Sequence, residues 1–178
     1  MSRIAPAMGP INAEIEIDVP RERIFELIAD LSARPAFTDR FLSDFHLTRL
    51  EPHGVGAGAR FRVEQPLRSV WMDTTIAELE APHKIVEHGQ GGRLNRIRTR
   101  TVWELTEGPG SLTTVRFAHW TEPGPVDRAL ELASGASFWQ QRRWREALRR
   151  LRDQLESESP RAARIAVAGG NRYATGVP

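Results

Sequence analysis

The feature that most constrains the fold is one long amphipathic helix, expected over about residues 126–156, that follows a run of strands. At roughly 100° per residue its apolar side chains form a single stripe. The stripe contains Val126, Leu130, Ala133, Ser137, Gln140, Gln141, Trp144, Leu148, Leu151 and Leu155. The leucines at the C-terminal end predict tight packing on a sheet. The small and amide side chains in the middle predict a space between helix and sheet, unless aromatic residues of the sheet fill it.

The polar face of this helix carries six arginines between residues 142 and 152. Arginine-rich helices also bind nucleic acid, so two interpretations compete. Here the arginines lie away from the apolar stripe, and Glu146, Asp153 and Glu156 share their surface at helical spacing. We therefore expect a solvated helix face.

Three further arginines, Arg96, Arg98 and Arg100, alternate along a strand and are expected on the outer face of the sheet. No aromatic residue is expected between them to stack on bases. The formal net charge is only +2, because the high pI near 9.9 reflects basic residues that are all arginine except Lys84. We expect no nucleic-acid partner.

The segment before the helix predicts a first strand, two short helices and about six strands. Residues 11–19 alternate apolar and polar side chains, which is typical of a half-buried strand. A short helix is expected over about 21–31, and a second one begins at Ser32. Strands are then expected within 45–52, 54–66, 69–82 and 83–89, followed by a hairpin over 96–120 that turns at 107–111. This order indicates an α+β fold with an antiparallel sheet.

The composition and the two ends of the chain set further limits. There is no cysteine, which excludes thiolate catalysis and cysteine-based metal sites. No apolar run approaches the roughly 20 residues of a membrane-spanning helix, and the N-terminus lacks the apolar stretch of a secretory signal. We expect a cytoplasmic protein with a flexible N-terminus over 1–10 and a disordered tail over 157–178.

Several segments together resemble the START-like superfamily, also called SRPBCC, which includes polyketide cyclases and dehydrases and lipid-transfer proteins. They are "EIEIDVPRERIFELIADL", "GVGAGARFRV", "TIAELEAPHKIVEH", the strands ending "WEL" and "TTVRF", and the amphipathic helix. The resemblance covers residues 11–156. It implies a helix-grip fold, in which a curved antiparallel sheet of about seven strands wraps around the C-terminal helix over an apolar cavity. No catalytic residues of the superfamily can be matched here, so the resemblance implies a fold and not an activity.

The leading functional hypothesis is a protein that binds a small hydrophobic or aromatic molecule, such as a lipid, a polyketide-like compound or an isoprenoid, between sheet and helix. Strand parity and the helix stripe predict the residues that line the site. They are Phe61, Val63, Met72, Thr74, Thr101, Trp103, Phe117, His119, Ser137, Gln141 and Trp144. Apolar walls would supply affinity, and the few polar groups would orient the ligand.

Two other hypotheses remain open. His119 points toward the cavity by parity with Val115 and Phe117, so it is a candidate acid or base of a cyclase or dehydrase, or a group that only orients the ligand. Either Glu87 or His88 faces inward on the same sheet, and parity does not decide which. The third hypothesis is an interaction protein with an incidental cavity.

The sequence also allows expectations about metal sites, cofactors and self-association. The five histidines show no ligand spacing, so we expect no metal site, and no motif points to a cofactor. Phe138 and Trp139 lie off the helix stripe. They are expected either to pack at the cavity mouth or to form a self-association patch, such as that of a homodimer.

Overall fold

A computed structural model describes residues 8–157, 164–167 and 170–173. The elements in chain order are β1 (Met8–Asp18), α1 (Arg21–Ala29), α2 (Pro35–Thr38), β2 (Leu42–Leu47), β3 (Gly58–Glu64), β4 (Ser69–Glu80), β5 (Lys84–Gly91), the 3₁₀ helix η1 (Arg93–Asn95), β6 (Ile97–Glu107), β7 (Leu112–Glu122), α3 (Pro125–Ser134), α4 (Ala136–Glu156), β8 (Arg164–Val167) and β9 (Gly170–Tyr173).

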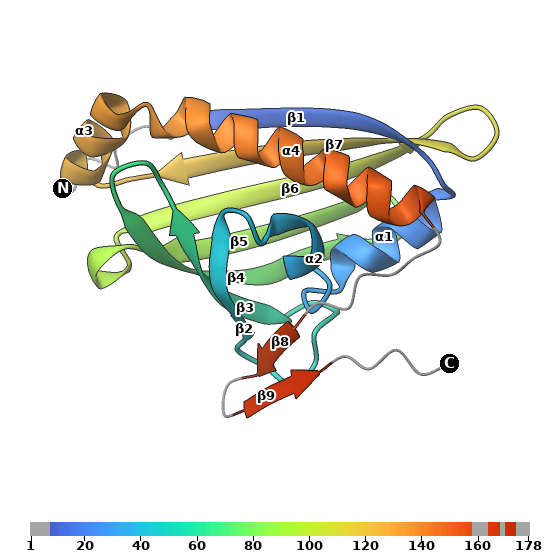
Figure 1. Ribbon diagram of the computed structural model, residues 1–178, viewed down its shortest axis with the longest axis horizontal. Coiled ribbons are helices and arrows are strands. Elements are labelled where there is room, and N and C mark those ends of the chain that lie inside the picture. The colour runs from blue at the N-terminus through green and yellow to red at the C-terminus, as the bar shows by residue number, and fades with distance from the viewer. Residues whose placement is uncertain (1–7, 158–163, 168–169, 174–178) are drawn as a thin grey trace.

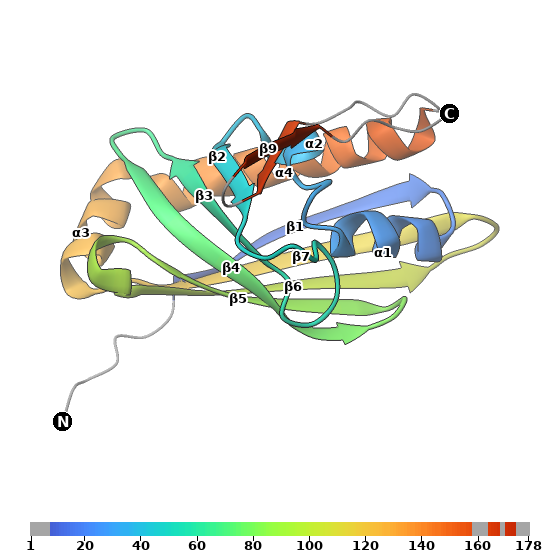
Figure 2. The same cartoon turned by 90° about the horizontal axis from the view of Figure 1, so that it is seen from below.

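Seven strands form an antiparallel sheet in the order β1-β7-β6-β5-β4-β3-β2. The sheet curls into a half-barrel, and α4 lies along its hollow side next to β1 (Figures 1 and 2). The two short helices α1 and α2 follow the first strand, and α2 packs against α4. The predicted α+β helix-grip fold is confirmed.

The alternating pattern of β1 sets which of its faces meets the core. Ile11, Ala13 and Ile17 are buried, while Asn12 and Glu14 are exposed. Because successive side chains of a strand point to opposite faces, this pattern turns one face of the edge strand toward the hollow side of the sheet. The burial of these apolar side chains contributes about 25 cal/mol per Å² to folding.

Two glycines of β5 permit the sharp curl of the sheet. A Cβ atom on Gly91 would overlap the backbone oxygen of Trp71 and Sδ of Met72 on the neighbouring strand. A Cβ atom on Gly89 would lie 2.8 Å from the backbone oxygen of Asp73. Only glycine allows β4 and β5 to approach this closely at these positions.

An aromatic cluster fills the space under the middle of α4. The ring centroid of Trp144 lies 4.1 Å from that of Phe117 and 5.9 Å from that of Trp103. Leu148 and Leu151 continue the contact toward the end of the helix and are almost fully buried. The C-terminal half of α4 is therefore packed on the sheet, and the cavity described below lies under its N-terminal half.

The long helix expected over 126–156 is interrupted. Gly135 adopts a left-handed conformation (φ 64°) and separates α3 from α4. This break changes the phase of the helix, because a left-handed residue ends one helix and starts the next in a new direction. Val126 and Leu130 are exposed (74% and 45%), although the continuous stripe predicts that they face the sheet, and Glu131 is buried instead.

The two ends of the chain differ in part from the expectation. β1 begins at Met8, inside the segment expected to be flexible, and residues 1–7 lie outside the described range. Within the segment 157–178, β8 pairs in parallel with β2, and β9 pairs with β8. Residues 158–163, 168–169 and 174–178 lie outside the described range, so the expectation of a disordered tail stays a prediction for them.

None of the helices in the described part of the chain is long and apolar enough to cross a membrane.

Candidate functional site

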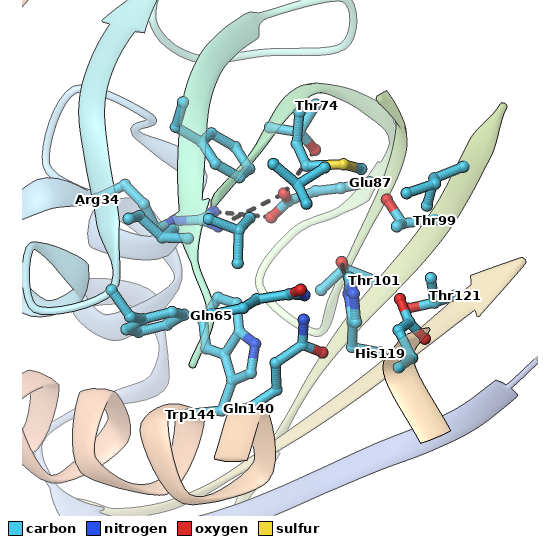
Figure 3. Close-up of a pocket in the computed structure, with 18 residues that line it drawn as sticks. Arg34, Gln65, Thr74, Glu87, Thr99, Thr101, His119, Thr121, Gln140 and Trp144 are labelled. Carbon is cyan, nitrogen blue, oxygen red and sulfur yellow. Dashed lines mark hydrogen bonds and ion pairs between the residues drawn. The ribbon is translucent and has the colours of Figure 1, made fainter. Parts of the chain in front are cut away.

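One cavity lies between the hollow side of the sheet and the N-terminal half of α4, and we refer to it as the main cavity (Figure 3). Its volume is about 60 Å³. The walls come from β2 to β7, α3, α4 and the segment before α2. The lining residues are Arg34, Phe41, Leu42, Phe61, Val63, Gln65, Val70, Met72, Thr74, Glu87, Ile97, Thr99, Thr101, His119, Thr121, Glu131, Gln140 and Trp144.

Most of the residues expected to line the site lie on this cavity. They are Phe61, Val63, Met72, Thr74, Thr101, His119 and Trp144. The strand residues among them all point to the inner face of the sheet. The alternation of side chains along a strand was therefore enough to predict them.

Trp103 and Phe117 have the expected parity but lie outside the cavity lining. Both are buried almost completely, with 0% and 1% of their surface exposed. They sit where α4 packs directly on the sheet, and Trp144 stacks on Phe117. Alternation shows to which face of the sheet a side chain points, but it does not show how far along the strand the cavity extends.

Ser137 and Gln141 also lie outside the main cavity. They line a neighbouring groove of about 230 Å³ together with Met8, Pro10, Ile11 and Phe138. Gln140 lies four residues before Trp144 on the same face of α4 and reaches the main cavity, whereas Gln141 lies to one side of that face. Gln141 instead donates a hydrogen bond to the backbone oxygen of Asn12 (3.5 Å).

A buried ion pair that sequence reasoning missed lies on the cavity wall. Arg34 Nη2 donates to Glu87 Oε1 at 2.7 Å, and both side chains are at most 4% exposed. Glu87 therefore faces inward, and His88 is exposed. Thr74 Oγ1 and Trp103 Nε1 also donate to the Glu87 carboxylate, at 3.1 and 2.9 Å. The sequence marks Glu87 only as one of two positions that could face inward, and nothing in it marks Arg34.

These contacts keep Glu87 ionised. Burial would raise its pKa, but the nearby charge of Arg34 and the hydrogen bonds from Arg34, Trp103 and Thr74 together lower the pKa of Glu87 below its ordinary value. A carboxylate that accepts from several donors and has a low pKa is poorly suited to proton transfer near neutral pH. Glu87 is better suited to be a fixed negative charge in the cavity wall.

His119 is a partly buried, uncharged imidazole at the same cavity. Burial lowers the pKa of His119 to about 4, although the charge of Glu87 acts in the opposite direction. Its Nδ1 atom is hydrogen-bonded to Thr101 Oγ1 at 2.8 Å, and its ring is nearly parallel to that of Phe117. The ring is therefore neutral and held in place at physiological pH. Such an imidazole orients a ligand by hydrogen bonding better than it acts as a general base.

The two aromatic residues off the helix stripe have different surroundings. Phe138 is 77% exposed and borders the groove. Trp139 packs edge-on against Phe41, and the guanidinium of Arg143 lies 5.3 Å from its ring centroid. Trp139 thus belongs to the packed wall next to the cavity, while Phe138 is available on the surface.

Some arginines of α4 and of the outer sheet face contact other side chains of the protein. Arg143 pairs with Glu146 at 3.0 Å, as expected for a solvated helix face. On the outer sheet face, the Arg100 guanidinium lies 5.8 Å from the ring of Trp120. This tryptophan belongs to the neighbouring strand β7, and no aromatic residue lies between the three arginines along their own segment. The absence of a nucleic-acid partner stays a prediction.

Within the residues that the structure describes, no group of three or more His, Cys, Asp or Glu side chains is placed to hold a metal ion.

A curled antiparallel sheet closed by a long helix, over a cavity lined by both apolar and polar side chains, defines a class of helix-grip proteins. The family model described as polyketide cyclase / dehydrase and lipid transport matches residues 8–156, and the chain belongs to this family. The START-like assignment made from the sequence is confirmed.

Solved structures of low sequence identity share the fold. TTHA0849 from Thermus thermophilus is 17% identical, with a TM-score of 0.66 over 85% of this chain and 99% of that one. A START superfamily protein from Mycobacterium smegmatis is 14% identical, with a TM-score of 0.59 over 83% and 99%. DynU16, from the dynemicin biosynthetic locus, is 18% identical, with a TM-score of 0.54 over 85% of this chain and 48% of that one. A search of curated proteins found no match.

Proposed function

We propose that this protein binds a small hydrophobic or aromatic molecule, of the lipid, polyketide-like or isoprenoid kind, in the cavity under α4. The observation that carries the proposal is the lining itself. Phe61, Val63, Met72 and Trp144 give apolar walls, and His119 offers a neutral hydrogen-bonding group among them. Apolar walls with a few fixed polar groups are the usual make-up of a small-molecule site. We expect the protein to act in the cytoplasm.

The cavity must widen when it takes up a ligand. Its volume of about 60 Å³ is small, because an engineered apolar cavity that binds benzene measures about 150 Å³. Typical ligand pockets measure roughly 300–1,000 Å³. Among the large side chains at its border Phe61 is only partly buried, so it is the one expected to move aside.

A second candidate function is catalysis of the cyclase or dehydrase type in the same cavity. The description of the family favours it, and DynU16 comes from a biosynthetic locus. The low pKa of His119 weighs against a general base at neutral pH, because only a base with a pKa near the working pH is efficient. Binding is therefore the better-supported function.

A titration with 1-ethylnaphthalene, an apolar aromatic probe, tests the proposal, alongside native mass spectrometry for a small molecule that co-purifies. Thr99→Leu fills the cavity and should weaken probe binding at least tenfold. Thr75→Leu makes the same change at an exposed position of β4 and serves as the matched control. Absence of saturable binding and of any co-purified molecule would refute the proposal, as would equal binding by the two variants.

A further inference from the structure

The helix α3 has the reverse of the usual burial pattern, because its apolar side chains are exposed and a charged side chain is buried. Its apolar residues Val126, Leu130 and Leu132 are 74%, 45% and 67% exposed, whereas Glu131 is only 7% exposed. Glu131 is also the one residue of α3 that is buried. A surface helix normally buries its leucines, so the inward glutamate requires an explanation.

No hydrogen-bond donor of the described residues contacts the Glu131 carboxylate. The positive charge that acts on Glu131 is that of Arg68, whose Nη1 atom donates to Asp127 at 2.6 Å and whose buried Nη2 atom has no hydrogen-bond partner. Burial raises the pKa of Glu131, the charge of Arg68 lowers it, and that of Asp127 raises it further. The side chain is mostly buried, yet its carboxylate oxygens still reach open space, where a bound donor can recover the hydrogen bonds that partial burial costs.

Glu131 and Glu87 line the same cavity but differ in how many hydrogen-bond donors their carboxylates have. The carboxylate of Glu87 is occupied by donors from Arg34, Thr74 and Trp103. No donor of the described residues contacts the Glu131 carboxylate, although Glu131 lines the same cavity. A ligand's donor group therefore finds a free acceptor at Glu131 and not at Glu87.

The position of Glu131 shows which part of a ligand it would meet. Glu131, Thr121 and Gln140 line both the main cavity and the groove that holds Phe138. They thus form the junction between the two spaces, and Gln140 and Thr121 face the cavity there (Figure 3). A molecule too long for the main cavity passes this junction on its way into the groove.

We propose that Glu131, with Thr121 and Gln140, forms a polar subsite that binds a hydrogen-bond-donating group, a hydroxyl or a protonated amine, on an otherwise apolar ligand. This subsite rests on the proposed binding function and specifies the class of ligand. The apolar body lies in the main cavity or the groove, and the donor group lies at their junction.

Three probes of the same shape test the subsite: 1-ethylnaphthalene, 2-(1-naphthyl)ethanol and 2-(1-naphthyl)ethylamine. The wild-type protein should bind the alcohol, the amine or both about fivefold or more tightly than 1-ethylnaphthalene. Glu131→Leu should abolish this preference while still binding 1-ethylnaphthalene. Glu131→Gln separates the two donors, because a neutral amide still accepts from the alcohol but no longer attracts the ammonium. Glu122→Leu and Glu122→Gln, at an exposed position of β7, are the matched controls.

The outcomes distinguish the two proposals. If none of the three probes binds to the wild-type protein, the binding function itself is refuted, and the subsite with it. If 1-ethylnaphthalene binds but neither donor group improves binding, or if Glu131→Leu keeps the preference, only the subsite is refuted. Thermal unfolding of each variant checks that it is folded, and the nearly isosteric Glu131→Gln keeps the test valid should the leucine variant unfold.

Discussion

The ion pair of Arg34 and Glu87 offers the most direct test of the structure. Glu87→Leu leaves the guanidinium of Arg34 buried without its partner, and removal of one member of a buried pair costs about 3–5 kcal/mol. For a chain of this size about 1 kcal/mol shifts the unfolding midpoint by roughly 2–4 °C. The expected loss is therefore on the order of 10 °C. The double variant Arg34→Met, Glu87→Leu should recover most of it, because apolar side chains often replace a buried pair at little cost.

Urea unfolding of the wild type, both single variants and the double variant gives the coupling free energy of the pair. The exposed pair of Glu14 and Arg116 has a similar N–O distance, 2.6 Å, and serves as the control. Glu14→Gln should leave the midpoint unchanged, because exposed pairs contribute little. Single variants Arg34→Met and Glu87→Leu with wild-type stability would show that the pair is not buried as described, and the proposed fixed charge in the cavity wall would be wrong.

Three further changes have expected outcomes. Because burial lowers the pKa of His119 from 6.5 to about 4, the unfolded chain binds a proton there first as the pH falls, and the stability should decline between about pH 6.5 and 4. His119→Gln should flatten this decline, measured by urea unfolding at each pH. Trp103→Phe removes the indole donor to Glu87 and should cost about 1–3 kcal/mol of unfolding free energy, whereas Trp71→Phe on the outer face should cost far less. Gly91→Ala should lower the thermal midpoint clearly, because its methyl group overlaps Trp71 and Met72, whereas Gly124→Ala meets only an ordinary contact; equal midpoints would contradict the close approach of β4 and β5.

The fold could be predicted because its signals are local and periodic. Alternation in β1, and in the hairpin formed by β6 and β7, shows which residues face inward, and the leucines of α4 show where the helix packs. These patterns depend on strand and helix geometry and hardly at all on the rest of the chain. The same patterns placed Thr101 and His119 on the cavity wall.

The parts that could not be predicted depend on irregular backbone. On β5, Ile85, Val86 and Glu87 are buried in succession, next to a register shift between Ile76 and Glu78 on β4, so simple alternation could not assign a face to Glu87. The break at Gly135 likewise invalidates a helical wheel drawn through it. The partner of Glu87, Arg34, lies 53 residues earlier in the chain, and no local pattern joins two such positions.

The exposed leucines of α3 have a consequence for how the molecule opens. Because α3 buries no large apolar side chain, its separation from the body would expose little new apolar surface. Its local opening free energy should therefore be far below that of α4, whose Leu148 and Leu151 are buried in the core. Amide hydrogen exchange should be fast in α3 and slow in the second half of α4. The segment over the junction of the two spaces can then detach many times while the rest of the fold stays intact, which would make ligand exchange independent of global unfolding.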